Sequence, residues 1–508
     1  MLPGAGSSGV RVGGGGVRAL VLGGGFGGIA AALRLRARGY RVHLVDRCPR
    51  LGGRAQVFER GGYHHDAGPT VITAPFLFAE LFTLFGQDLA DHIEMRPLDP
   101  WYRFRFPDGA LFDYGPGEAR LEAEIARFEP RDVAGYRSLL AESRALFDVA
   151  FTELADQPFD RASTMLRQLP RLLQRRIDRS VWQMVCRHIR HPYLRRALSL
   201  QPLLIGGNPL QTTCIYGLIH YLERRWGIHF AMGGTGALVD ALAGLLESTG
   251  VTVELGRSVE RLERDGRRVT AALLDDGRRL TADAFVSNLD PLHLYGELLQ
   301  PAPLAARLKA RTASHSMGLF VLYFGTDRQY PEVAHHTIWL GERYEALLRD
   351  IFQRRVLPED FSLYLHRPTA TDPSFAPPGH DAWYVLAPVP NLLGGIDWAE
   401  AGPALEARII DALQATLLPG LRDHLRAPFH MTPADFARDY NSVHGTGFSV
   451  SPLFRQSAWF RFHNRAEGLD NLYLVGAGTH PGAGLPGVLS SAKVVERLLP
   501  DTTGRSAA

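Results

Sequence analysis

The sequence predicts an α/β fold with a nucleotide-binding unit at its amino-terminal end. A strand, glycine-rich loop, helix and second strand follow one another in residues 17–46, and another strand, glycine-rich loop and helix occupy residues 472–499. Three short strands are predicted between them, at 251–255, 270–274 and 279–286. At about 150 residues per domain, the 508 residues suit three domains or one large composite domain.

The composition is that of a globular chain. Apolar residues make up 45% and charged residues 21% of it, which excludes a disordered or fibrous protein. The three cysteines, Cys48, Cys186 and Cys214, are too few and too widely spaced for a disulfide framework or a zinc ribbon. The net charge of +3 favours no class of partner by itself.

Neither a signal peptide nor a spanning helix is predicted. Residues 1–16 are rich in glycine and lack the apolar run of a signal peptide, so we expect them to form a disordered leader. The most apolar long window, residues 67–86, is interrupted by Pro69, Pro75 and Glu80, which disfavours a membrane-spanning helix.

The amino-terminal unit has the spacing of a dinucleotide site. Gly23 allows a tight turn after the strand at 17–22, and Gly25 lets the backbone approach a pyrophosphate. Gly28 lets the helix predicted at 29–38 pack closely on the strand, and the helix's positive end favours the phosphates. Asp46, at the end of the second strand, is placed to bind a ribose and disfavours a 2′-phosphate, so FAD or NAD is preferred over NADP. A simple packing turn is the alternative interpretation.

The segment after Asp46 favours FAD over NAD. The pair Gly52-Gly53 lets the chain pass close to a ligand, and Arg54 is able to reach a phosphate or a flavin. Residues 58–70 suggest a chain that turns back across a cofactor, where a plain nicotinamide unit would continue into another helix. The alternative for Arg54 is a surface position.

The carboxyl-terminal loop, residues 476–487, contains five glycines in twelve residues. Its backbone is bare enough for a planar ring to lie against it. The helix predicted to begin near Val488 places positive potential beside the N1 and O2 edge of a flavin. A structural Gly-Pro turn is the alternative.

Together these segments resemble the bacterial phytoene desaturases, FAD-dependent enzymes of carotenoid synthesis. The resemblance spans nearly the whole chain and includes VLGGGFGGIAAALRLRARGYRVHLVD at 21–46, LGGRA at 51–55, DAGPTVIT at 66–73, LLIGGNP at 203–209, GGTGALVDAL at 233–242 and NLYLVGAGTHPGAGLPGV at 471–488. Amine oxidases share the first site and the GGR, but usually not the GTHPGAG-x-PGV of the last segment.

The resemblance implies a Rossmann-type FAD-binding domain that is assembled from discontinuous segments, with an α+β substrate domain inserted between them. The FAD domain is expected to combine residues 17–100, 231–295 and 456–500. A substrate and membrane-associating helical region is expected at 101–230, and the substrate domain at 296–455.

The cofactor contacts expected from the motifs and the resemblance are Gly23, Gly25, Phe26, Gly27, Gly28, Asp46, Arg47, Gly53, Arg54, Gly68, Pro69, Thr70, Val259, Gly478, Gly487 and Val488.

No catalytic base and no metal site is assigned. His480 lies in the glycine-rich loop, but its side chain is as suited to holding the loop, and Arg167 is as suited to facing lipid as substrate. Residues 186–191 include a cysteine and two histidines, but the flanking arginines would repel a cation. His335 and His336 are interpreted as strand or loop residues.

The implied reaction is the successive introduction of double bonds into phytoene, to products such as neurosporene or lycopene. A flavin takes the hydride at N5, and the second hydrogen leaves as a proton. Oxygen or a quinone would re-oxidise the flavin. The alternatives are a different carotenoid desaturase or isomerase, an amine or protoporphyrinogen oxidase, and a flavin-free prenyl-binding scaffold.

A basic stretch covers residues 161–196. It holds ten arginines and one aspartate, a local charge of +9, which leaves −6 for the rest of a chain whose total is +3. Apolar residues recur at roughly helical spacing, with expected interruptions at Pro170 and Pro192. Such a basic amphipathic pattern is typical of a peripheral membrane binder, so we expect the protein on the cytoplasmic face of a membrane.

Two other interpretations of this stretch are open. The first is that it forms the solvated face of an ordinary helical domain. Nucleic acid is disfavoured because no nucleic-acid motif accompanies the arginines.

Earlier in the chain, residues 102–106 and 111–114 predict a hairpin. Its aromatic side chains are expected either to line a tunnel or to fill an ordinary sheet core.

Overall fold

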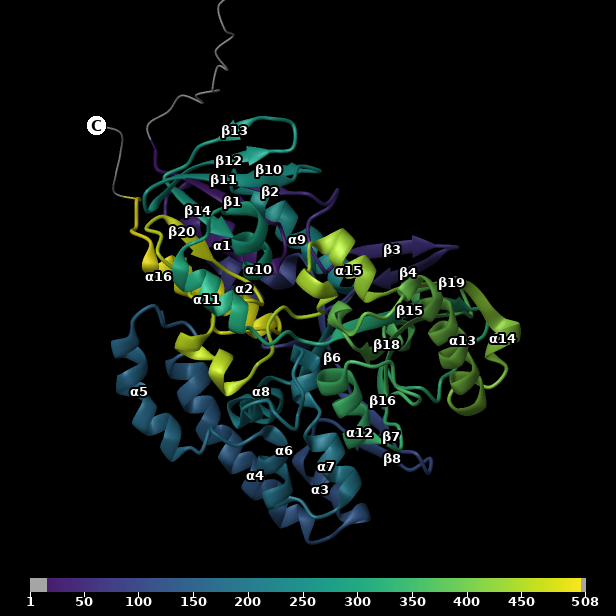
Figure 1. The fold of residues 1–508 in the computed structure, drawn as a ribbon. Coiled ribbons are helices and arrows are strands. Elements are labelled where there is room, and N and C mark those ends of the chain that lie inside the picture. The colour runs from purple at the N-terminus through teal and green to yellow at the C-terminus, as the bar shows by residue number, and fades with distance from the viewer. Residues whose placement is uncertain (1–15, 504–508) are drawn as a thin grey trace, which may run out of the picture.

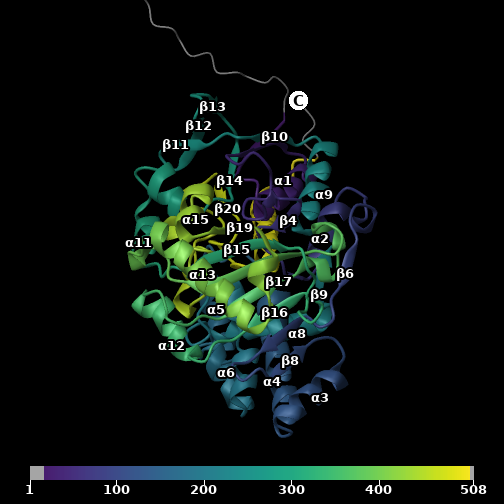
Figure 2. The ribbon, with the colours of Figure 1, turned by 90° about the vertical axis from the view of Figure 1, so that its right-hand side faces the viewer.

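The computed structural model describes residues 16–503, except for the side chains of residues 169 and 171–173. The predicted leader therefore lies outside the described residues, apart from Gly16. Two sheet-based layers occupy one end of the molecule, and a group of helices occupies the other (Figures 1 and 2).

A five-stranded parallel sheet forms the nucleotide-binding layer. Its strand order is that of a Rossmann-type fold: β10 (Thr252–Leu255), β2 (Arg41–Asp46), β1 (Arg18–Leu22), β14 (Ala284–Ser287) and β20 (Leu472–Leu474). The prediction that this sheet is built from distant segments is confirmed, because β1 pairs with β14 and β14 pairs with β20.

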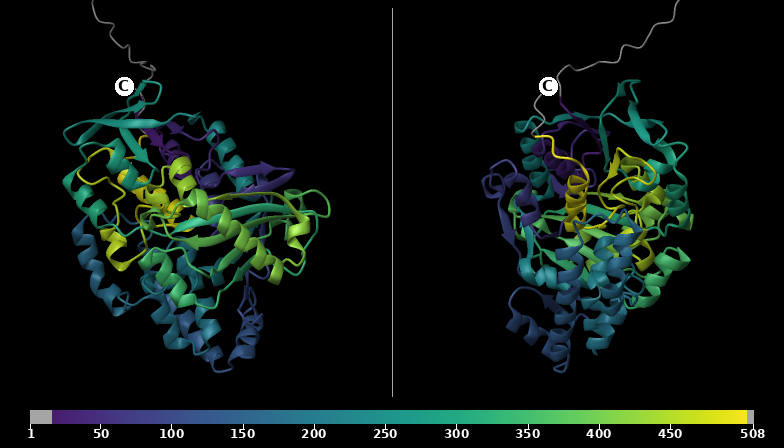
Figure 3. Two further views of the ribbon diagram at one scale, coloured as in Figure 1. Left: turned by 45° about the vertical axis from the view of Figure 1, so that its right-hand side comes forward. Right: turned by 90° about the vertical axis from the view of Figure 1, so that its left-hand side faces the viewer.

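Four helices accompany this sheet: α1 (Phe26–Ala37), α2 (Phe76–Thr83), α9 (Gly234–Ser248) and α16 (Leu485–Leu498). α16 packs against α1, so the last helix of the chain covers the first (Figure 3). Both α1 and α16 begin three residues before the predicted starts, within their glycine loops. Apolar side chains of β1, α1, α9 and α16 share one buried core.

Three small sheets lie beside this layer. They are made of β11 (Val259–Asp265), β12 (Arg268–Leu274) and β13 (Arg279–Leu280); of β3 (Val57–Arg60) and β4 (Tyr63–Asp66); and of β5 (Ile72–Thr73), β9 (Ile228–Ala231) and β6 (Met95–Pro97). The single strand predicted at 279–286 is wrong. The run is divided between β13 and β14, which belong to different sheets, and the alternation of the sequence did not show this break.

A seven-stranded mixed sheet forms the second layer. Its order is β19 (Leu425–Met431), β15 (Gly318–Thr326), β18 (Asp381–Val389), β17 (Leu363–His366), β16 (His336–Trp339), β7 (Tyr102–Arg105) and β8 (Leu111–Tyr114). The predicted hairpin is confirmed as β7 and β8. Of its aromatic residues, Tyr102 lines the central cavity, whereas Phe104, Phe112 and Tyr114 fill a buried core.

Strand β15, second from one edge of this sheet, is buried on both sides, and its side chains alternate between two faces. Phe320, Leu322 and Phe324 pack in the core that includes the long helix α13 (Trp398–Thr416). Leu319 and Val321 belong to the other core, and Leu319 reaches the cavity. One face of the sheet is therefore structural, and the other serves the cavity. Figure 3 shows α13 lying along this sheet.

The remaining helices of the two layers are α10 (Pro291–His293), α11 (Leu304–Thr312), α12 (Tyr344–Arg349), α14 (Leu421–His424) and α15 (Pro433–Tyr440). The helical region at the other end comprises α3 (Glu118–Phe128), α4 (Asp132–Phe147), α5 (Ala162–Gln174), α6 (Val181–His188), α7 (Pro192–Leu198) and α8 (Leu218–Trp226).

The basic stretch forms α5, α6 and α7. The interruption expected at Pro170 is wrong, because α5 continues through it; a proline removes one backbone hydrogen bond but keeps a helical φ. Pro192 does mark a break, since it begins α7, where its missing N–H costs nothing. No helix within residues 16–503 is long and apolar enough to cross a membrane.

Candidate functional site

A cavity of about 570 Å³ runs between the two layers and into the helical region. Every predicted cofactor residue except Gly28 lines it, from Gly23 at the end of β1 to Val488 in α16. These residues come from the carboxyl ends of parallel strands and from the loops that follow them, where open α/β sheets bind their ligands. The structure thus brings the separated motifs to one site.

The glycines of the first loop leave space for a ligand and for close packing. Gly23 has a φ of +94°, a conformation that suits glycine. A Cβ on Gly27 would lie 2.5 Å from Asn288 Oδ1, and one on Gly28 would lie 1.9 Å from the carbonyl oxygen of Gly23. Gly28 is therefore a packing residue outside the cavity, as its predicted role against the strand requires.

Asp46 and Arg54 present charge to this end of the cavity. Asp46 is 7% exposed, and its Oδ1 accepts a hydrogen bond from the Cys48 backbone N–H at 2.7 Å. Arg54 donates to Ser442 Oγ at 3.0 Å. Burial lowers the pKa of the Arg54 guanidinium, and the nearby carboxylate of Asp290 opposes that shift. A carboxylate is able to accept more hydrogen bonds than the protein donates to Asp46, so Asp46 is also able to accept hydrogen bonds from a ribose.

Asp290 and Asn288 are functional candidates that the sequence did not reveal. Both line the cavity next to the first glycine loop. Asp290 Oδ1 accepts from Ser449 Oγ at 3.0 Å, while its buried Oδ2 has no partner among residues 16–503. No local pattern marks them, because they follow β14, whose place in the sheet is set by long-range pairing.

The carboxyl-terminal glycine loop is held by a buried arginine. Arg461 is 2% exposed and donates to the carbonyl oxygens of Thr479 at 3.0 Å and Ala477 at 2.6 Å. The loop leads into α16, which begins at Leu485. Arg461 therefore fixes the backbone that faces the cavity, a role that its position in the QSAWFRFHNR segment did not indicate.

The surroundings of His480 and Arg167 decide between the alternative roles that the sequence left open for each. His480 is buried, its Nε2 lies 3.2 Å from the carbonyl oxygen of Leu154, and burial lowers its pKa to about 4. It is a neutral tether between the loop and the helical region. Arg167 is exposed on α5 and does not line the cavity.

The rest of the cavity is apolar, and one buried carboxyl group lies at its wall. Its lining there includes Leu154, Phe159, Met165, Ile177, Leu200, Leu203, Leu204, Ile215, Leu218, Ile219 and Leu222. Glu223, in α8, also lines the cavity and has no exposed surface. Tyr102 donates to Glu223 Oε1 at 3.3 Å, and Oε2 has no partner among residues 16–503.

Burial raises the pKa of Glu223 from its usual 4.5 to about 7. The hydroxyl of Tyr102 and the charge of Arg224 oppose the shift without cancelling it. A carboxyl group with this pKa is able to exchange a proton near neutral pH. This role could not be predicted from local sequence, because Glu223 stands in the ordinary helical segment YLERRW.

The basic stretch divides into buried and exposed parts. Ile177, Val181, Met184 and Val185 belong to the helical core and face no solvent. Arg179 is held by Glu142 at 2.6 Å. α5 differs, since Leu166 is 66% exposed there and Met165, on the same helix, lines the cavity.

A parallel sheet of Rossmann-type order, a glycine-lined cavity end and an apolar continuation are the features of a flavin-dependent oxidoreductase. The family model of the flavin-containing amine oxidoreductases matches residues 26–495. The solved putrescine oxidase bound to putrescine has the same fold, with a TM-score of 0.63 over 95% of this chain and 98% of its own, at 14% identity. The cofactor of this chain is FAD, for which the bare glycine backbone, the free capacity of Asp46 and the orphaned Asp290 Oδ2 are a suitable cradle.

Two proteins of similar sequence show to which group within this family the chain belongs. The lycopene-forming phytoene desaturase of Pantoea ananas is 47% identical over 482 residues, which covers 94% of this chain and 98% of the relative. The neurosporene-forming phytoene desaturase of Rhodobacter capsulatus is 40% identical over 493 residues, covering 95% and 94%. The chain belongs to the flavin-containing amine oxidoreductase family and, within it, to the phytoene desaturases.

Proposed function

We propose that the protein is an FAD-dependent phytoene desaturase that introduces successive double bonds into phytoene, giving carotenes of the neurosporene or lycopene type. The observation that supports this most directly is the single cavity that joins the glycine-lined cofactor end to a long apolar end. A hydrocarbon chain suits the apolar end, and its reacting carbons would then lie near the cofactor. FAD, when bound, supplies the hydride acceptor at N5.

The protein's own contribution is positioning, exclusion of water and removal of a proton. Each desaturation breaks two C–H bonds on neighbouring carbons: one hydrogen leaves with its electron pair, and the other leaves as a proton whose bonding pair forms the C=C bond. Glu223 is the proton acceptor in this proposal, because it lines the apolar part of the cavity, its Oε2 has no partner among residues 16–503, and its raised pKa keeps it a usable base. Bound FAD would also have to be re-oxidised between turnovers, and oxygen or a quinone is the acceptor in this proposal.

The activity is tested by expressing the protein in cells that accumulate phytoene and analysing the pigments. We expect phytoene to fall and coloured carotenes to appear. Colourless cells that contain folded, flavin-loaded protein would refute the substrate assignment.

The membrane-facing surface in this proposal is the outer side of α5, α11 and the turn Ala458–Phe460. Leu166, Leu304 and Leu308 are 66%, 64% and 53% exposed, and Phe460 is 39% exposed. These elements adjoin one another: α5 contacts the turn, and Lys309 Nζ of α11 lies 5.9 Å from the ring of Trp459 in the same turn.

This surface also overlies one end of the cavity. Met165 of α5 and Ala458 of the turn both line it. Exposed arginines on α5 and α11 and just after α5, including Arg167 of α5, Arg307 of α11 and Arg175, would attract anionic lipid headgroups at about 1 kcal/mol each. A carotene dissolved in the bilayer would therefore have a short path to the cavity from the cytoplasmic face.

Cosedimentation with anionic liposomes tests the docking surface. The triple variant Leu166→Ser, Leu304→Ser and Leu308→Ser is expected to reduce binding at least tenfold, and salt is expected to weaken the wild type. Leu111→Ser, which changes a leucine that is 39% exposed on the β7–β8 hairpin, is the matched control. Equal binding of the triple variant and the control would refute this surface.

A further inference from the structure

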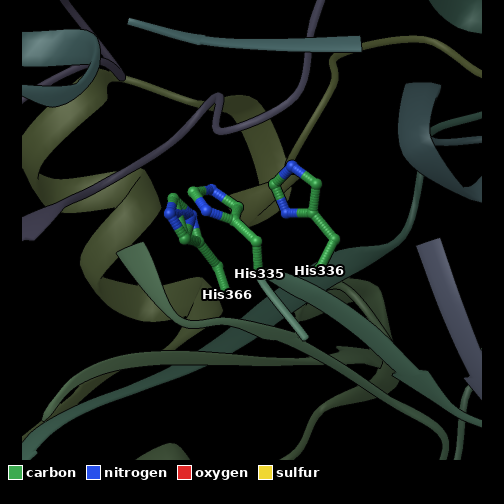
Figure 4. A group of neighbouring side chains, drawn as sticks. All are labelled: His335, His336 and His366. Atoms are coloured by element: carbon green, nitrogen blue, oxygen red, sulfur yellow. The ribbon is translucent and has the colours of Figure 1, made fainter. Parts of the chain in front are cut away.

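Three buried histidines stand together on the cavity-side strands of the seven-stranded sheet. His336 of β16 is the register partner of His366 of β17, so their side chains share one face of the sheet. His335 directly precedes β16, outside the strand's alternation, and also joins this group. Figure 4 shows the three rings standing on the same side of the strands.

The ring nitrogens are close enough to share one ligand. One ligand nitrogen from each of the three residues lies within 4.8 Å of the others. The ring centroid of His335 lies 4.6 Å from that of His336 and 4.8 Å from that of His366. Among residues 16–503, no other group of three metal-binding side chains comes this close together.

The hydrogen bonds made by the rings of His335 and His336 use Nδ1 and leave Nε2 free in each ring. His335 Nδ1 lies 2.7 Å from Thr371 Oγ1, and His336 Nδ1 lies 2.8 Å from the hydroxyl of Tyr364. A tautomer that carries its proton on Nδ1 donates to these oxygens and leaves the Nε2 lone pair available. An Nδ1 partner of this kind is what orients metal-bound imidazoles.

The remaining nitrogens are buried without partners. His335 Nε2, His336 Nε2 and both ring nitrogens of His366 have no hydrogen-bond partner within the described part of the chain. The three residues are 6%, 0% and 1% exposed. Burying such groups unpaired is costly, and one cation would satisfy three of them at once.

The charges around the three histidines permit a bound cation. Burial lowers the pKa of all three imidazoles, so they are neutral, the state that binds metals. The nearby cation Arg367 is ion-paired with Asp381 at 3.3 Å, which offsets its charge. Phe230 closes the cluster, with its ring 4.7 Å from that of His335.

We propose that His335, His336 and His366 form a binding site for one transition-metal cation of the zinc class. Neutral imidazole is a preferred ligand of Zn²⁺, Co²⁺ and Cu⁺, and a three-histidine set leaves a fourth position open. Tyr364, which supports His336, also lies 2.6 Å from Thr70 Oγ1 at the cavity wall. The metal would thereby fix the hydroxyl of Tyr364 between the cluster and the cavity.

The first test measures the metal content of full-length, flavin-loaded protein from zinc-supplemented cells after gel filtration. We expect about one zinc per chain, as in other histidine sites that exclude solvent. His336→Asn and His366→Asn should lower this at least tenfold, while His64→Asn, at a partly exposed histidine of β4, should not change it. Flavin content identifies variants that have misfolded.

The second test uses only the wild-type protein. Metal-free protein prepared in the presence of chelator is loaded with Co²⁺ alone, which should give the ligand-field absorption of a nitrogen-coordinated tetrahedral site and a higher unfolding temperature. The proposal is overturned if wild-type protein holds no zinc above the His366→Asn level, or if Co²⁺ changes neither the absorption nor the unfolding temperature. Both outcomes are independent of carotene desaturation.

Discussion

Replacing Glu223 by glutamine removes the one carboxylate of the apolar cavity end while keeping its shape. Tyr102 retains an acceptor in the new amide oxygen, and the buried Gln201 Oε1, which has no partner among the described residues, is available to the new amide N–H. Glutamine therefore tests the proton-accepting role with little risk to the fold. If Glu223 takes the proton, the rate of flavin reduction by phytoene should fall about 10²–10⁴-fold.

The pH dependence follows from the same group. An acceptor with a pKa of about 7 is about a tenth ionised at pH 6 and about nine-tenths at pH 8, so the wild-type reduction rate should rise nearly tenfold between them. This rise should vanish in Glu223→Gln. Tyr102→Phe, which removes the donor to Oε1, should move the rise to higher pH.

The free energy of unfolding gives an independent measure of the ionisation of Glu223. Because the folded-state pKa is raised from 4.5 to about 7, the stability that the protonated carboxyl provides is present below pH 4.5 and is lost as the pH rises through 7. The loss corresponds to about 3 kcal/mol. Above pH 7, the free energy of unfolding of Glu223→Gln should exceed that of the wild type by up to this amount.

Anaerobic stopped-flow measurement of flavin absorbance, with phytoene in liposomes, checks the rates, and chemical denaturation checks the stability. Glu247→Gln, at an exposed position of α9, is the matched control and should behave as wild type. A reduction rate within threefold of wild type, with the pH rise intact, would refute the assignment of Glu223.

The remaining predictions concern the cofactor end. Arg461→Met should lower the free energy of unfolding by about 3–5 kcal/mol and reduce flavin retention after gel filtration, because the carbonyl oxygens of the loop lose a buried donor. Gly28→Ala should abolish flavin binding, measured by absorbance of the purified protein, because its Cβ would meet the Gly23 carbonyl at 1.9 Å; normal flavin content would contradict the packing role. Asp46→Asn should weaken FAD binding about tenfold or more, measured by titration of the deflavinated protein, and an unchanged affinity would exclude a ribose contact.

The parts of the fold that follow local rules could be predicted from the sequence. The strand, glycine loop and helix around Gly23 are adjacent in the chain, and their spacing alone indicated the turn, the helix and the acid at Asp46. The hairpin of β7 and β8 was equally local, since its turn residues at 107–109 lie between two alternating runs.

The parts that depend on tertiary contacts could not be predicted in this way. Nothing near Glu223 marks it as buried, because its burial comes from the packing of α8 beneath Tyr102. The arginines of α6 and α7 looked like those of α5, yet their apolar neighbours pack inward and only α5 presents an exposed leucine. His366 lies thirty positions beyond His336, and only the strand register brings them together.

The order of strands in the parallel sheet has a consequence for the protein's synthesis. β14 lies between β1 and β20, and a growing chain produces β20 long after β14. Until then, the edge of β14 is unpaired, and neither the glycine loop at 476–487 nor α16 is in place. Unpaired strand edges are prone to wrong pairing, so nascent chains depend on rapid completion or on chaperones. Flavin is therefore captured only after β20 and α16 have been synthesised, and a message truncated before residue 472 would yield a protein unable to hold its cofactor.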